Sequence, residues 1–159
     1  AWFVDEIQYV NSANEEIEAI HDLDPLQKAV VDKKFESVVQ SIPSDSLASI
    51  ELVSYEPNYL KYEVNSEKGG TVVFSEIYYP KGWNISIDGK PAEMVEVNYT
   101  LRGLNIPAGN HKVVFSFEPE VVKTGSTISL ITSIIALLLV AAGIFFATRN
   151  KNEEKVQNI

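Results

Sequence analysis

The chain has 159 residues, of which 45% are hydrophobic and 22% charged, which suffices for one folded domain with an appendage. It contains no cysteine, which excludes disulfides, thiolate metal ligands and cysteine nucleophiles. Residues 1–123 carry 20 acidic and 10 basic side chains without an Arg or Lys cluster, which argues against nucleic-acid binding. The chain begins with Ala1 and shows no signal peptide, so we expect it to be a piece of a longer protein.

A short helix is predicted near the N-terminus, over residues 14–24. Ser12 and Glu15 have the spacing of a capping box, and apolar side chains at Ile17, Ile20 and Leu23 form one face. The pair Asp24-Pro25 then predicts a second helical turn, because it can supply an N-cap followed by a first helical residue.

Beyond this helix, and also at residues 2–10, the hydrophobic pattern has the period of two that is typical of strands. Turn-forming sequences such as EKGG, DGKP and PAGN separate the strand-like runs. The runs lie at residues 2–10, 29–39, 49–56, 59–66, 71–79, 83–88, 92–98, 99–106 and 111–118. The sequence therefore predicts a mainly β fold, an antiparallel β-sandwich with a short N-terminal helix.

The segment YYPKGWNISIDGK, residues 78–90, is predicted to be a loop followed by a hairpin. Trp83, Ile85 and Ile87 alternate with polar residues, and Asp88-Gly89 suits the positive φ angles of a tight turn.

A transmembrane helix is predicted after the sandwich. Residues 124–148 contain no formal charge, and 25 residues of helix at about 1.5 Å each cross a hydrocarbon core of about 30 Å. The basic side chains of the tail favour a cytoplasmic C-terminus. We therefore expect an extracytoplasmic domain at 1–120, a single transmembrane helix at 121–148 and a short cytoplasmic tail at 149–159. A stripe of small residues along the helix fits either packing against another helix or the ordinary composition of membrane spans.

Motifs of known catalytic or metal chemistry are not found. His21 and His111 lack the spacing of metal ligands, and His111 fits a strand residue beside a turn. Glu76 and Asp88 flank the aromatic loop like a glycosidase pair, but a turn role for Asp88 and a solvated strand position for Glu76 explain them better. We predict no catalytic residue, no metal site and no cofactor in this chain.

Four residues are candidates for carbohydrate binding: Tyr79, Trp83 and Tyr99 as stacking rings and Arg102 as a polar anchor. The alternative is architectural. Trp83 would then fill the core of the sandwich, the tyrosines would lie at its rim, and Arg102 would pair with a carboxylate or an anion.

The order of YYPKGW with its DGK turn, NYTLRGL and IPAGNHKVVFSFEP, followed by an apolar helix, resembles the C-terminal end of the YfhO-like family of bacterial membrane proteins. The resemblance covers most of the chain. The positions that match the family pattern are Tyr79, Pro80, Gly82, Trp83, Asp88, Gly89, Asn98, Tyr99, Arg102, Gly109 and His111.

The resemblance implies a large polytopic protein, similar to glycosyltransferases that use lipid-linked sugar donors, with this sandwich as its terminal extracytoplasmic domain. The catalytic acidic residues of such enzymes are expected near the other end of the protein, so no activity is expected of this chain. The implied location is the bacterial cytoplasmic membrane. The implied partners are membrane lipid, the upstream transmembrane helices of the parent chain and, in the alternative function of a membrane-anchored binding module, carbohydrate.

Overall fold

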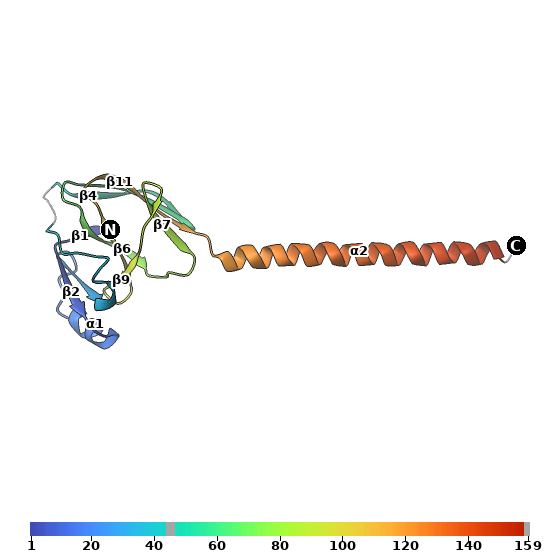
Figure 1. The fold of residues 1–159 in the computed structure, drawn as a ribbon, viewed down its shortest axis with the longest axis horizontal. Coiled ribbons are helices and arrows are strands. Elements are labelled where there is room, and N and C mark those ends of the chain that lie inside the picture. The colour runs from blue at the N-terminus through green and yellow to red at the C-terminus, as the bar shows by residue number, and fades with distance from the viewer. Residues whose placement is uncertain (44–46, 158–159) are drawn as a thin grey trace. The chain divides into compact units, whose positions relative to one another are not determined.

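The computed structural model describes residues 1–43 and 47–157, with side chains of the C-terminal helix described as far as Phe145. The chain divides into two units, Ala1–Glu118 and Pro119–Ile159, which are described separately below (Figure 1).

The first unit is a β-sandwich of two antiparallel sheets, which confirms the predicted fold class (Figure 1). The four-stranded sheet has the order β1 (Trp2–Val4), β6 (Gly70–Ile77), β10 (Leu101–Ile106) and β9 (Val95–Val97). The five-stranded sheet has the order β4 (Ser49–Glu56), β5 (Tyr59–Ser66), β11 (Gly109–Phe117), β7 (Trp83–Ile87) and β8 (Lys90–Pro91).

The main core lies between these sheets and follows from the period-two pattern of the strands. At its centre are Tyr62, Phe74 and Phe115, whose rings meet edge to face with centroids 4.9–6.1 Å apart. This geometry suits the electrostatics of aromatic rings, so the three side chains fix the spacing of the sheets.

The N-terminal segment forms a separate β-α-β element. β2 (Glu6–Val10) pairs with β3 (Lys28–Asp32) in parallel, and α1 (Ala13–Ile20) connects them. The Ser12 side chain accepts a hydrogen bond from the Glu15 N–H and caps α1 as predicted. The helix ends at Ile20, before the predicted end at residue 24.

Two predicted strands were wrong in extent. Residues 2–10 form two strands in different sheets, because the backbone turns at Asp5, whose N–H donates to the carbonyl of Gln27. The strand predicted at 29–39 ends at Asp32, whose side chain accepts from the Lys34 N–H and starts the 3-10 helix η1 (Lys33–Phe35).

A second core lies between the β-α-β element and the outer face of the four-stranded sheet. Its buried members are mostly valines: Val4, Ile7, Ala29, Val31, Val39, Val73, Val95 and Val97. Gly103 lies against it, and a Cβ atom built there would be 2.5 Å from a methyl carbon of Val97. The valine side chains of the neighbouring strand β9 occupy the space beside Gly103, which is available because this residue has no side chain.

The second unit is the helix α2 (Glu120–Gln157). Its segment Glu120–Phe145 is long and apolar enough to cross a membrane, and none of it is buried against protein in this structure. The hydroxyls of Thr127, Thr132 and Ser133 donate to carbonyls one turn earlier. Such bonds satisfy these polar groups within the helix itself, as a hydrocarbon environment requires.

Candidate ligand-binding surface

The segment 78–90 contains the predicted hairpin. β7 passes into a turn in which Asp88 has φ 52° and Gly89 has φ 78°, and β8 then pairs back against β7. Positive φ at both central residues defines a type I′ turn, which matches the twist of the two strands. The sequence prediction is confirmed here in detail.

The guanidinium of Arg102 lies between the sheets and stacks on Trp83. The central carbon of the guanidinium is 4.4 Å from the Trp83 ring centroid and 5.4 Å from that of Phe115. Nε donates to the carbonyl of Ile77 at 2.8 Å, whereas Nη1 has no hydrogen-bond partner among the described residues. Burial lowers the pKa of Arg102, and the negative charge of Glu76 opposes that shift.

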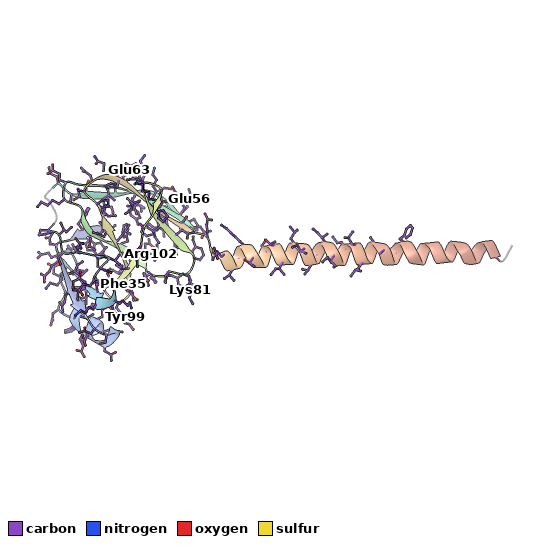
Figure 2. All side chains as sticks on the ribbon, viewed as in Figure 1. Phe35, Glu56, Glu63, Lys81, Tyr99 and Arg102 are labelled. Atoms are coloured by element: carbon purple, nitrogen blue, oxygen red, sulfur yellow. The ribbon has the colours of Figure 1, made fainter. Side chains whose placement is uncertain are left out.

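Arg102 therefore contacts the Trp83 ring rather than solvent. Arg102 is only 3% exposed, and Figure 2 shows it within the sandwich. Trp83 is half-buried, with its ring 5.3 Å from that of Phe117. A cation over an aromatic face is attracted by the ring quadrupole, and this contact links β10 to β7 across the core.

The two tyrosine candidates are more accessible. Tyr79 is 49% exposed and lies 6.5 Å from the ring of Phe117. Tyr99 is 41% exposed and is located in the turn before β10, apart from Arg102 (Figure 2). Its backbone N–H donates to the carboxylate of Glu16, a buried side chain of α1. The four residues do not form one exposed platform, and carbohydrate binding by them stays a prediction.

The turn containing Tyr99 begins at Asn98, a position that matches the family pattern but for which the sequence did not predict a turn. Asn98 has φ 49° and Tyr99 has φ 67°, so two non-glycine residues adopt the left-handed conformation. Because of this turn, the strands predicted at 92–98 and 99–106 are shorter than expected, at 95–97 and 101–106.

An ion pair joins Asp88 and His111 at the opposite end of the sandwich. His111 Nδ1 lies 2.7 Å from Asp88 Oδ2, and the other carboxylate oxygen accepts from the Lys112 N–H at 2.8 Å. These bonds lower the pKa of Asp88, and the same carboxylate raises the pKa of His111. Asp88 therefore serves the turn and the neighbouring strand.

This pair lines an open groove of about 680 Å³ on the five-stranded sheet. Its other lining residues are mostly polar: Ser49, Glu51, Glu63, Val64, Asn65, Asn110 and Lys112. Glu51 lies directly opposite Glu63, and Lys112 lies opposite Glu63 on the other side. Sequence analysis missed this groove, because only the strand register brings these side chains together.

The residues considered for catalysis do not converge. β7 runs from the loop at 78–82 to the other end of the sandwich, which separates Asp88 from Glu76 at the end of β6. Within the described residues, no group of three or more His, Cys, Asp or Glu side chains is arranged to hold a metal ion.

The fold and these sites define a β-sandwich whose chain continues into one long apolar helix. The family model described as "Bacterial membrane protein YfhO" matches residues 27–129, and the chain belongs to this family. This confirms the resemblance noted in the sequence.

One curated relative is the "Uncharacterized protein YfhO" of Bacillus subtilis (strain 168), 19% identical over 112 residues. The match covers 70% of this chain and 13% of the relative, so the chain corresponds to a small part of that protein. No solved structure matches the chain significantly.

Proposed function

We propose that this chain is the accessory extracytoplasmic domain and last membrane helix of a polytopic YfhO-family protein. The observation that carries the proposal is the extent of the family match, which begins at β3, runs through the sandwich and continues into α2. The sandwich and the helix are therefore parts of one family unit. Because the matched segment covers 13% of the relative, the proposal places most of the parent protein outside this chain.

We infer the sidedness from charge. Arg149, Lys151 and Lys155 follow the apolar segment, and positive residues next to a membrane helix favour the cytoplasmic side. The sandwich would then lie outside the cytoplasmic membrane. Lys68 lies in an exposed hairpin, so Lys68→Cys in an otherwise cysteine-free full-length protein tests this arrangement. A membrane-impermeant maleimide should label it in intact cells, and labelling only after lysis would contradict the sidedness.

The activity proposed for the parent protein is transfer of a sugar from a lipid-linked donor, with the sandwich assisting the catalytic core. The family resemblance supports this activity. The accessory role is supported by the hydrogen bonds of three polar side chains. Asp88, Glu16 and Arg102 bond to backbone groups of neighbouring segments, which is a structural use of these side chains and not a catalytic one.

The test is to delete residues 1–118 from the full-length protein, retain α2, and measure sugar transfer in isolated membranes. We expect normal insertion and reduced transfer. Lys68→Ala, a change at an exposed hairpin position outside the groove, provides a control that should keep full transfer. Unchanged transfer after the deletion would refute the accessory role. A full-length protein with no further apolar spans would refute the proposal that the parent protein is polytopic.

A second candidate function is carbohydrate binding, which the exposure of Tyr79 and Tyr99 favours. Titration of the full chain in lipid nanodiscs against a glycan panel tests it, with Tyr79→Ala and Tyr99→Ala as the altered proteins. Binding that both substitutions weaken would support this function. No binding at millimolar sugar would count against it.

A further inference from the structure

We propose that one end of the sandwich contacts the headgroup region of the membrane. This surface, the aromatic end, is formed by Tyr55, Tyr59, Ile77, Tyr79, Trp83 and Phe117. The proposed partner is the lipid interface itself.

The strand register and two backbone hydrogen bonds bring together the segments that carry these residues. Phe117 lies opposite Trp83, while the neighbouring Ser116 lies opposite Tyr59. The N–H of Phe117 donates to the carbonyl of Asn58, and the next N–H along the chain donates to the carbonyl of Gly82. The β4–β5 hairpin, the loop between β6 and β7, and the end of β11 therefore meet at one end of the sandwich.

The aromatic end exposes large side chains. Tyr55 is 68% exposed and Ile77 is 71% exposed. Tyr79 is half-exposed, and one side of its ring lies near the ring of Phe117. Single exposed apolar residues are common on protein surfaces, but here three lie at one end of the sandwich. Tyrosine and tryptophan combine an apolar ring with a polar tip, and this combination favours the boundary between hydrocarbon and water.

The covalent chain keeps this end near the membrane. Only Glu118 and Pro119 separate Phe117 from the first residue of α2, and the uncharged segment begins at Thr124. Three extended residue steps and four helical steps span about 17 Å at most, and this limit holds whatever angle the two units adopt. The headgroup region adds roughly 5–8 Å beyond the hydrocarbon on each side, so Phe117 is confined close to it.

The contact should depend on apolar and aromatic groups rather than on charge. Residues 1–123 have a net charge of −10 with histidine neutral, which disfavours attraction to anionic lipid. Figure 2 shows Lys81 and Glu56 on this part of the sandwich, so both signs of charge occur there. We therefore expect the contact with neutral lipid and no strengthening by anionic lipid.

The absence of cysteine in the chain permits a direct test. An environment-sensitive fluorophore is attached to a single cysteine that replaces either Ile77 or Tyr79. Each labelled full chain is reconstituted into phosphatidylcholine nanodiscs, with and without phosphatidylglycerol. Matched controls are Lys68→Cys and Asn110→Cys, exposed positions near the opposite end of the strands. Lipids with a nitroxide close to the headgroup quench from the membrane side, and iodide quenches from water.

We expect lipid quenching several-fold stronger at positions 77 and 79 than at 68 and 110, with iodide quenching in the reverse order. This pattern should be the same with and without anionic lipid. Equal lipid quenching at all four positions would overturn the proposal. Protection of positions 77 and 79 from both quenchers would also overturn it, since a protein surface would then cover the aromatic end.

Discussion

Asn98 provides the sharpest test of how the sandwich is connected to its N-terminal element. Its side-chain Oδ1 accepts from the Val30 N–H at 2.8 Å, and its own N–H donates to the Val30 carbonyl at 2.8 Å. Val30 is fully buried, so its N–H depends on this side-chain acceptor and not on bulk water. The left-handed φ of 49° adds a second requirement at the same residue.

Two substitutions separate these requirements. Asn98→Gly keeps the backbone conformation and leaves the Val30 N–H without its acceptor, which costs about 1–3 kcal/mol of unfolding free energy. Asn98→Ala loses the acceptor and also places an ordinary side chain at positive φ, which adds roughly 1 kcal/mol. The total of about 2–4 kcal/mol is a large fraction of the 5–15 kcal/mol typical of a domain.

Urea unfolding of the full chain in detergent micelles, followed by tryptophan fluorescence, measures both changes. Trp2 lies in the four-stranded sheet and Trp83 in the five-stranded sheet, so their fluorescence reports on the unfolding of both sheets. Asn110→Ala is the control and should change stability by less than about 0.5 kcal/mol. If Asn98→Gly matches the control, or if Asn98→Ala is no worse than Asn98→Gly, the reasoning is refuted.

Three further predictions concern other contacts. Gly103→Ala should destabilise the sandwich by about 1–3 kcal/mol in urea unfolding, because the new methyl group overpacks the valine core. Asp88→Asn should lower the pKa of His111 toward its ordinary value of about 6.5 in an NMR titration. Burial raises the pKa of Glu16, so this carboxylate destabilises the fold once it is ionised. Glu16→Gln should therefore raise the melting temperature at neutral pH while its amide oxygen still accepts from the Tyr99 N–H.

The Asp88–His111 pair also predicts the direction of a pH effect. The pKa of His111 is raised in the folded state, so its contribution to stability is present below the unfolded pKa and is lost as pH rises through the folded pKa. The pKa of Asp88 is lowered, so its contribution is lost as pH falls through the folded pKa. In Asp88→Asn the stability should vary less with pH in both ranges.

Each of these predictions has an opposing outcome. A Gly103→Ala protein as stable as the parent would show that the Val95 and Val97 side chains adjust easily to the added methyl group. An unshifted His111 titration would show that the ion pair does not form in solution. A lower melting temperature for Glu16→Gln would show that the ionised carboxylate is preferred at this position.

Local patterns in the sequence predicted most of the sandwich. The strands at 49–56 and 59–66 have the predicted bounds, because alternation and turn residues specify a hairpin without reference to the rest of the chain. The Asp88-Gly89 turn is equally local.

The parts that were not predicted depend on contacts between distant segments. The parallel pairing of β2 with β3 requires the outer face of the four-stranded sheet as support, and no local pattern distinguishes it from an antiparallel edge. The stacking of Arg102 on Trp83 also joins two sheets. The sequence suggested a carboxylate or an anion as the partner of this arginine and did not indicate an aromatic ring.

The valine core around Gly103 has a consequence for the order in which the protein folds. Its N-terminal members, Val4 and Val31, are made first, but Val73 and Val97 must be present before the layer can close. Contacts across such long sequence separations make folding slow, because the chain pays loop-closure entropy before they form. During synthesis the apolar face of the β-α-β element therefore stays exposed until the ribosome has made most of the sandwich strands.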